Sequence, residues 1–383
     1  MENVSTRRIT AYLKGIAITG VVVGHTLWYY IPGAWRTTQG YENGMVSIFF
    51  VLSGYGIYHS LEQRVSATEN LRRYLPGFYA RRAWKIYPLF WFTLIVSPFF
   101  LHQFSSWHVF SFGMIAKYFG LTAFMWSYPR YDDFTWFIHA ILPCYLLLPF
   151  MFLLLRKVGL RKYLALNFAL IACFAATSFF ILRFVIAIPD QAFVYRSFIL
   201  GNFFFFSFGM TIPRSSPLFK SMIKNFATRY LLVAVAIISF ALTLRYSRIP
   251  SVIFHNSEAL LTPLFIVAAF ILCLIFIVTR PLLPLRQAFC FLGNHSYPIY
   301  MLHLSLWGLF LSWGVTYRQT RLVNGPAGNV PLTLLMLVPF LVICVGIDRL
   351  QISSEKWFVS WRRKRMKPPE TVPETGLTGD QSY

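Results

Sequence analysis

The sequence predicts an all-α, polytopic membrane protein with about ten transmembrane helices and both termini in the cytoplasm. Three observations support this prediction. Hydrophobic residues make up 57% of the 383 residues and charged residues only 13%, which is about half the charged share of a soluble domain. The apolar residues form continuous runs, and most basic residues lie between alternate runs. A single soluble core cannot bury this much apolar surface, so a cytosolic globular protein is excluded.

A transmembrane helix needs roughly 20 mostly apolar residues. The apolar runs do not alternate with polar residues as barrel strands would, so helices are expected. Basic residues before the first run resemble a signal peptide, but no small-residue cleavage site follows, which predicts an uncleaved first helix. The predicted spans are 9–30, 45–61, 86–105, 136–155, 163–188, 193–212, 228–245, 258–278, 289–315 and 331–350.

Two segments lie outside this series of spans. Residues 107–126 are apolar and aromatic but are interrupted by Lys117 and Gly120, which predicts an interfacial or re-entrant helix. The end of the chain is basic at first and then, from about 366 on, rich in Pro, Thr, Gly and acids. Such a composition cannot bury a core. We therefore expect a transmembrane domain over 1–350 and a cytoplasmic tail over 351–383 that ends in disorder.

The basic residues test the number and direction of the spans. The formal charge is +22, from 35 Lys and Arg against 13 Asp and Glu. With the N-terminus in the cytoplasm, the inside segments hold 26 of the 35 basic residues, as the positive-inside rule requires. One span too many or too few would move the segments that follow it to the opposite side of the membrane and would remove this asymmetry. The charge is thereby explained by topology, and we expect no nucleic-acid partner.

The cysteines and histidines show no metal-binding pattern. The five cysteines lie within or at the edges of predicted spans, and the eight histidines are scattered along the chain. Neither set has the spacing of a metal site. We expect the cysteines to be small apolar packing residues without disulfides, and we expect no bound metal.

The first span carries two ionisable residues, which are costly inside a membrane and therefore suggest function. Lys14 and His25 are eleven residues apart, so they point to the same side of a helix and are separated by ~16 Å along its axis. Taken singly, Lys14 is explained as a snorkelling interface lysine and His25 as a helix-packing residue. Together they predict a polar track leading from the cytoplasm into the membrane.

Histidine is the side chain best suited to accept a proton near neutral pH. The acids nearest to span ends are Asp190, Glu258 and Asp348, so we expect no intramembrane carboxylate beside His25. A Ser-His-Asp arrangement is not visible either. The simplest chemistry that this inventory allows is His25 acting alone as a general base on a substrate hydroxyl.

A dense basic cluster precedes the third span, in the segment YLPGFYARRAWKIYPLFW. Arg82 and Lys85 share a helix face there, and Arg81 lies beside them. The planar guanidinium of arginine can donate two parallel hydrogen bonds to phosphate oxygens. The cluster is therefore suited to a phosphorylated ligand on the cytoplasmic side. Positive-inside bias together with anionic lipid headgroups explains the same residues, and the pattern alone does not separate the two.

Two further segments place small or polar groups inside spans. Ser53, which is followed by a glycine, is a small polar residue within the apolar second span. In the ninth span, LGNHSYPIYMLHLSLW, Pro298 predicts a kink that frees backbone carbonyls beside Ser296, Tyr297 and His303. Close helix packing and a purely structural kink explain these residues as well as a substrate site does.

These segments, in this order, resemble the acyltransferase family 3 membrane proteins, which include O-acetylases of lipopolysaccharide, exopolysaccharide, Nod-factor sugars and peptidoglycan. Each matching piece is largely hydrophobic, but five pieces in the family's order on a ten-span topology are specific. The resemblance implies transfer of an acyl group, usually acetyl, from cytoplasmic acyl-coenzyme A to a sugar hydroxyl. The pieces, between residues 14 and 303, are KGIAITGVVVGHT, FFVLSGYGI, FYARRAWKIYPLFW, WFIHAILPCYLLLPF and LGNHSYPIYMLH.

The resemblance also assigns residues. The family's first span carries Arg, ten residues and then His; these positions fall on Lys14 and His25, and Lys keeps the charge but loses the fork geometry. The family's acidic residue three positions earlier falls on Ala11 and is absent. Its RxxR motif maps onto Arg82 and Lys85, again with Lys in place of the second Arg.

The implied mechanism joins the basic cluster to His25. Basic side chains hold the coenzyme A phosphates at the cytoplasmic mouth, and the pantetheine arm carries the thioester along the first helix. His25 then accepts the proton of an acceptor hydroxyl or relays the acyl group across the bilayer. The expected donor-binding residues are Lys14, Arg81, Arg82 and Lys85, and the expected pocket or supporting residues are Ser53, Trp136, Tyr145, Ser296, Tyr297 and His303.

We therefore expect an integral protein of the bacterial inner membrane. Its partners would be membrane lipids, acetyl-CoA as the acyl donor, and a glycan or lipid-linked saccharide as the acceptor. The main alternative is a polytopic transporter or exporter of lipid or glycan, which does not need the basic cluster beside the third span. A glycan polymerase is a second alternative, but such proteins usually show a long outside loop and the outside loops here are short.

Overall fold

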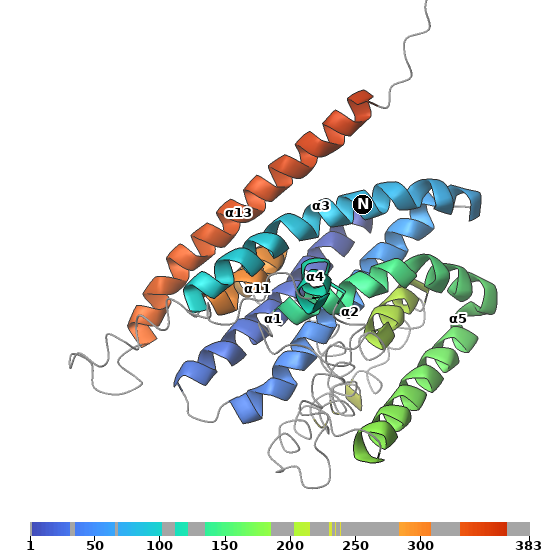
Figure 1. Ribbon diagram of the computed structural model, residues 1–383, viewed down its shortest axis with the longest axis horizontal. Coiled ribbons are helices and arrows are strands. Elements are labelled where there is room, and N and C mark those ends of the chain that lie inside the picture. Colours follow the sequence, from blue (N-terminus) through green and yellow to red (C-terminus); the bar gives the residue numbers. More distant parts are fainter. Residues whose placement is uncertain are drawn as a thin grey trace, which may run out of the picture.

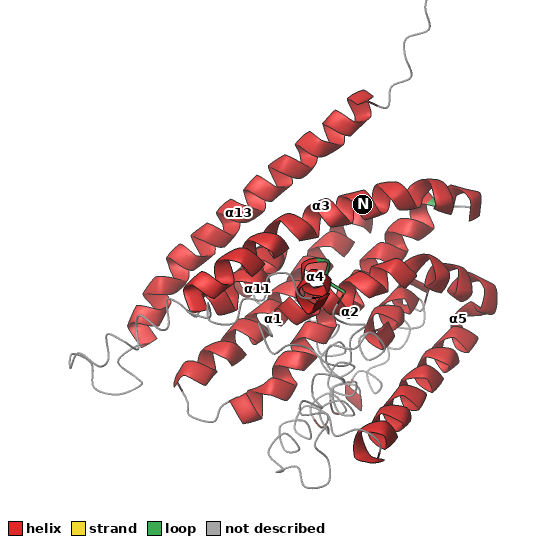
Figure 2. Ribbon diagram, viewed as in Figure 1, coloured by secondary structure: helices red, strands yellow, loops and turns green. Residues whose placement is uncertain are grey.

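The computed structural model describes residues 2–30, 35–65, 68–101, 112–121, 135–184, 203–214, 230, 231, 234, 238, 283–307 and 330–365. Every regular element within these ranges is a helix, as Figure 2 shows. The predicted all-α fold is therefore confirmed for this part of the chain.

The helices differ in length and regularity (Figure 1). The long helices are α1 (Glu2–Tyr30), α2 (Trp35–Arg64), α3 (Thr68–Leu101), α5 (Trp136–Phe184) and α13 (Val330–Arg365). The short ones are α4 (Phe112–Tyr118), α10 (Leu283–Asn294), α11 (Ser296–Leu302) and the π-helical turn η4 (His303–Trp307). A further helix covers residues 203–214.

Within the described ranges, three helical stretches are long and apolar enough to cross a membrane: Gly44–Gln63, Trp136–Leu170 and Leu335–Phe358. They coincide with predicted spans in α2, α5 and α13. Helices α1 and α3 cover the span predicted at 9–30 and most of the span predicted at 86–105. The spans predicted at 193–212, 228–245, 258–278 and 289–315 lie partly or wholly outside the described residues, so the number of ten spans stays a prediction.

Two boundaries differ from the sequence-based ones. α3 begins at Thr68, well before the predicted span at 86–105, so the basic segment is part of the helix and not a loop. α5 joins two predicted spans, and the break between them is a sharp bend at Gly159, where φ is 77° and ψ is 169°. Glycine adopts this left-handed φ without the steric cost of a Cβ, so the chain turns there without an intervening loop.

The predicted ninth span is broken into three pieces. α10 ends at Asn294, His295 forms a turn, and α11 then leads directly into η4. Pro298 lies in the first turn of α11, where a missing N–H leaves no helical hydrogen bond unmade. The predicted kink is thus realised as a helix break at His295, and the proline begins the next helix instead of bending the previous one.

The stretch predicted as an interfacial or re-entrant helix contains α4. Two side chains of α3 hold its end: the indole of Trp91 donates to the Tyr118 carbonyl at 2.9 Å, and the hydroxyl of Tyr87 donates to the Phe119 carbonyl at 3.1 Å. α4 is therefore docked on α3. Its depth in the membrane, interfacial or re-entrant, stays a prediction.

Glycines allow helix backbones to meet closely around α1 and α2. A Cβ at Gly15 of α1 would overlap the backbone of Phe289 in α10, and a Cβ at Gly293 of α10 would overlap the backbone of Ala11. Gly54 of α2 meets helix 203–214 in the same way. Such contacts between small residues are the usual means of packing helices in membranes.

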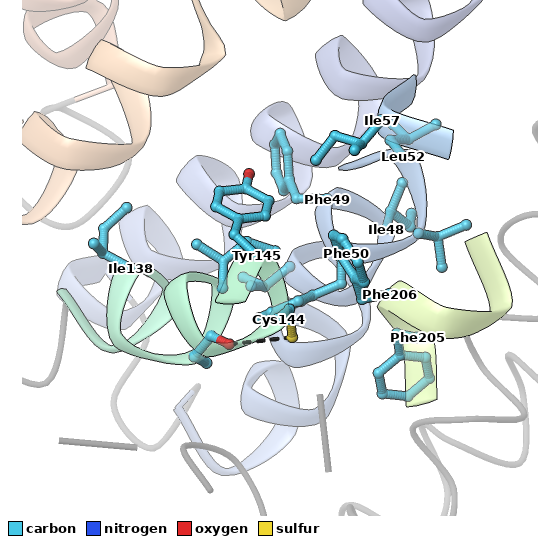
Figure 3. Packing of buried hydrophobic residues seen from close by; sticks show 14 of the residues in the cluster. Ile48, Phe49, Phe50, Leu52, Ile57, Ile138, Cys144, Tyr145, Phe205 and Phe206 are labelled. Atoms are coloured by element: carbon cyan, nitrogen blue, oxygen red, sulfur yellow. Dashed lines mark hydrogen bonds between the residues drawn. The ribbon is translucent and has the colours of Figure 1, made fainter. Parts of the chain in front are cut away.

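The hydrophobic core includes side chains from α1, α2, α3, α5, α11, α13 and helix 203–214, and its part between α2, α5 and helix 203–214 is drawn in Figure 3. Phe50 and Phe206 are fully buried. The ring of Phe206 meets that of Tyr145 edge-on, with centroids 5.9 Å apart. Beyond the bend of α5, the hydroxyls of Tyr163 and Ser207 lie 2.7 Å apart. Both halves of α5 are therefore attached to helix 203–214.

α13 runs along α3 at the edge of the molecule (Figure 1). Trp84 of α3 stacks on Phe358 with ring centroids 4.6 Å apart and donates to Ser354 at 3.2 Å. The other side of α13 is apolar and exposed, as at Leu350, which is 74% exposed. The helix continues past residue 350 to Arg365, so the first part of the predicted tail is helical. The tail from 366 on lies outside the described residues.

Candidate active site

α1 carries two of the residues expected to act, and each lies in a separate polar cluster. Lys14 is near the cytoplasmic end of the predicted span, and His25 lies eleven residues further along the same helix. The two are therefore ~16 Å apart along the axis. One side chain of α2 and one of η4 contact His25, whereas two charged side chains of α3 lie near Lys14.

His25 is held by its own helix through one ring nitrogen. Its Nδ1 lies 2.9 Å from the carbonyl oxygen of Val21. Because a carbonyl can only accept, we assign the hydrogen to Nδ1, which donates it. The other ring nitrogen, Nε2, is then the atom available for proton transfer. It lies 3.5 Å from Oε2 of Glu42 on α2.

Glu42 is a buried carboxylate, only 4% exposed, and it lies against Gly24 of α1, where a Cβ would overlap the carboxylate. The expectation that no carboxylate accompanies His25 is therefore wrong. It failed because the predicted span began at residue 45, which left Glu42 in a loop, whereas α2 begins at Trp35. A signal was present: in the predicted topology, His25 near the end of the first span and Glu42 just before the second span lie toward the same outer face.

A second imidazole completes this group. The rings of His25 and His303 meet edge-on with centroids 4.9 Å apart. His303 is 1% exposed, and its Nδ1 is hydrogen-bonded to the carbonyl of Tyr300. It begins the π-helical turn η4, an irregularity often found at functional sites. We call His25, Glu42 and His303 the histidine cluster.

The expected donor-binding residues largely come together. The ammonium of Lys14 is close enough to Lys85 and Arg82 on α3 to be repelled by both charges. We call these three residues the cation cluster. The guanidinium of Arg82 lies over the ring of Tyr145 at 5.3 Å, an arrangement that holds it in place. Arg81 instead lies over the ring of Tyr74 at 5.6 Å, so the structure attaches it to its own helix.

Carboxylates from α13 balance part of this positive charge. Asp348 and Glu355 both attract the ammonium of Lys85. Asp348 also lies 2.8 Å from Nδ1 of His295, at the break between α10 and α11. The cation cluster is therefore held where α1, α3 and α13 meet the interrupted ninth span.

The tyrosines expected to support the site lie beside the cation cluster. Tyr297 of α11 donates to the carbonyl of Ile86 at 2.6 Å, which joins α11 to α3. Tyr79 donates to the carbonyl of Tyr145 at 3.2 Å, and burial raises the pKa of its hydroxyl. Tyr79 therefore stays protonated and remains a donor. It was not among the residues expected from the sequence.

The other residues that were expected to line or support the site pack between helices. Ser53 precedes Gly54 in α2 and is partly buried, and Ser296 is buried at the start of α11. Trp136 begins α5 and packs against the hydrophobic core. Among the described residues, no group of three or more His, Cys, Asp or Glu side chains is placed to hold a metal ion.

Comparison with known families identifies the family of the chain. A family model for an acyltransferase domain matches residues 11–349, which includes both clusters. This chain belongs to the acyltransferase 3 family. Comparison with curated proteins and with solved structures gives no significant match in either set.

The family membership confirms the resemblance inferred from the sequence. Acyltransferase 3 proteins are polytopic membrane acyltransferases, so this chain is an integral membrane enzyme that moves an acyl group from a donor to an acceptor. The family match begins just before Lys14 and ends just after Asp348. The acyltransferase domain thus extends through most of the helices that form the candidate site.

Proposed function

We propose that the chain is an O-acyltransferase of the bacterial inner membrane. It moves an acetyl group from cytoplasmic acetyl-CoA to a hydroxyl of a cell-surface or lipid-linked glycan. The observation that carries the proposal is one helix with a cation cluster at one position and a paired histidine eleven residues away. An anionic, extended donor needs both: charges for its phosphates and a base near its thioester.

The chemistry follows from the two nitrogens of His25. Nδ1 is committed to the Val21 carbonyl, so Nε2 takes the proton of the acceptor hydroxyl. The hydroxyl oxygen attacks the thioester carbonyl carbon, the carbon–sulfur bond breaks, and the departing thiolate receives the proton from the imidazolium. The Glu42 carboxylate, 3.5 Å from Nε2, stabilises the positive ring between these two transfers. In a relay variant, Nε2 itself holds the acyl group before the acceptor hydroxyl takes it.

The donor is expected to lie along α1. Its phosphates bind Arg82, Lys85 and Lys14, since guanidinium and ammonium groups are the usual phosphate ligands. The ~16 Å between Lys14 and His25 is then covered by the pantetheine arm. Asp348 and Glu355 attract Lys85 and compete with the phosphates for it, which favours release of the product coenzyme A.

The first test replaces His25 with Ala. Loss of the general base lowers acyl transfer on the order of 10²–10⁴-fold. The measurement is coenzyme A thiol release in membranes supplied with acetyl-CoA and envelope glycan. The matched control is His59→Ala, because His59 lies on α2, where its ring contacts Gln63 and stacks on Tyr55. Retained activity in a correctly inserted His25→Ala protein would reject the proposed base.

A second test addresses the donor site. Arg82→Glu reverses a charge of the cation cluster and raises the KM for acetyl-CoA about 10- to 100-fold, the range for losing a hydrogen bond to a charged group. Arg156→Glu is the matched control, since Arg156 also lies over an aromatic ring, that of Phe152 at 5.6 Å, but on α5. Equal KM values for the two variants would argue against phosphate binding at Arg82.

A further inference from the structure

His303 is a buried imidazole whose role the proposed reaction leaves open. It is 1% exposed and begins η4, where the helix widens to a π-helical turn. A π-helical turn changes the direction of the side chains that follow it and costs regular hydrogen bonding. Here it places a polar ring against the base of the reaction, because the rings of His303 and His25 are 4.9 Å apart.

The hydrogen bonds of His303 define what it can bind. Its Nδ1 faces the carbonyl of Tyr300, and a carbonyl only accepts, so Nδ1 carries the hydrogen. In the neutral ring, Nε2 is then a pure acceptor. Among the residues that the structure describes, this Nε2 is buried without a hydrogen-bond partner. A buried acceptor left unpaired is costly, which indicates that a ligand donates to it.

The donor substrate does not offer such a group at this position. A thioester presents a carbonyl oxygen and a sulfur, and neither donates a hydrogen bond. The amide N–H groups of the pantetheine arm lie further back, toward Lys14. A sugar does offer donors, because it carries hydroxyls on neighbouring carbons.

We propose that Nε2 of His303 binds the acceptor sugar, accepting a hydrogen bond from a hydroxyl next to the one that His25 deprotonates. The acceptor class is therefore a sugar with adjacent free hydroxyls. This inference rests on the proposed acyl transfer. Two nitrogens on rings 4.9 Å apart hold two neighbouring oxygens, so one hydroxyl is presented to the thioester and the other fixes its orientation.

The test separates acceptor binding from donor chemistry. Membrane vesicles that expose the cytoplasmic face receive radiolabelled acetyl-CoA, and the label is followed into glycan ester and into free acetate. His303→Leu lowers transfer to glycan about 10- to 100-fold, as expected when a buried substrate hydroxyl loses its hydrogen-bond partner. Hydrolysis to acetate and the KM for acetyl-CoA change by no more than about twofold, because the donor site is intact.

Two further variants control for folding. His303→Gln keeps an acceptor oxygen and restores transfer to within about tenfold of the natural chain. His139→Leu removes another imidazole that is 1% exposed and leaves the ratio of glycan ester to acetate unchanged, even where it lowers the Tm.

Three results would overturn the inference: full transfer by His303→Leu, an equal loss of transfer and hydrolysis, or no rescue by His303→Gln. If the natural chain itself releases no coenzyme A from acetyl-CoA, the proposed acyl transfer fails, and the acceptor role of His303 fails with it.

Discussion

Glu42 gives His25 a counter-charge that a lone histidine would lack. Oε2 of Glu42 lies 3.5 Å from Nε2 of His25, and the carboxylate is almost fully buried. A positive imidazolium in such a place is costly unless an opposite charge is near. Glu42 therefore acts as a positioning and stabilising residue, and His25 exchanges the proton.

Replacing Glu42 with Gln keeps the shape of the side chain and removes its charge. We expect kcat to fall on the order of 10²-fold, because the imidazolium that forms during the transfer loses its buried counter-charge. The KM for acetyl-CoA stays the same, because the donor binds at the cation cluster. The measurement is labelled glycan formed at saturating acetyl-CoA.

The matched control for this change is Glu62→Gln. Glu62 is also on α2 but pairs with Arg214 at 3.7 Å, away from His25. A Glu42→Gln protein with the kcat of the natural chain would show that the carboxylate only fills space.

At the level of residues, the sequence indicates which side chains share one helix. It does not indicate which side chains meet when several helices pack together. The relation of Lys14 to His25 follows from helical periodicity alone. The pairing of His25 with Glu42 depends on where α2 begins, and a helix start is hard to place when polar residues such as Thr and Gln precede the apolar run. The contact with His303 depends on packing between segments far apart in the chain.

At the level of elements, α2 and helix 203–214 approach each other through glycine. A Cβ on Gly54 would overlap the backbone of Phe206, and backbone atoms yield less readily than the end of a flexible side chain. Gly54→Ala is therefore expected to destabilise the protein by about 1–3 kcal/mol through overpacking. Thermal unfolding in detergent measures this as a lower Tm.

Gly56 provides the control within the same helix. A Cβ at Gly56 meets nothing within 4 Å, and alanine favours helix over glycine. Gly56→Ala should therefore leave the Tm unchanged or raise it. If the two substitutions lower the Tm equally, the close approach at Gly54 is not what limits stability.

The bounds of a helix could be predicted where the sequence changes sharply from polar to apolar, and less well where the change is gradual. The apolar runs of α2, α5 and α13 are evident from hydropathy. The early start of α3 is hidden because its first part is polar and basic, yet it continues as one helix into the apolar part. The break at His295 was expected at Pro298, because proline is read as a kink when its place within a helix is unknown.

For the whole molecule, the length of α13 indicates how the chain sits in a bilayer. Its 36 residues extend about 54 Å, well beyond the ~30 Å hydrocarbon core. The apolar stretch ends at Phe358, and the sequence that follows carries Arg362, Arg363, Lys364 and Arg365. This end of α13 is therefore expected to project into the cytoplasm, on the same side as the cation cluster.

The orientation of the chain in the membrane decides whether the cation cluster can meet a cytoplasmic donor. With the N-terminus inside, 26 of the 35 basic residues lie on the cytoplasmic side. Reporter fusions after residue 66 and at Tyr383 should therefore fluoresce with green fluorescent protein and lack alkaline phosphatase activity. A fusion after residue 34, between α1 and α2, should behave in the opposite way. Phosphatase activity after residue 66 would place Arg82 and Lys85 outside, where acetyl-CoA is absent, and the proposed path of the donor along α1 would fail.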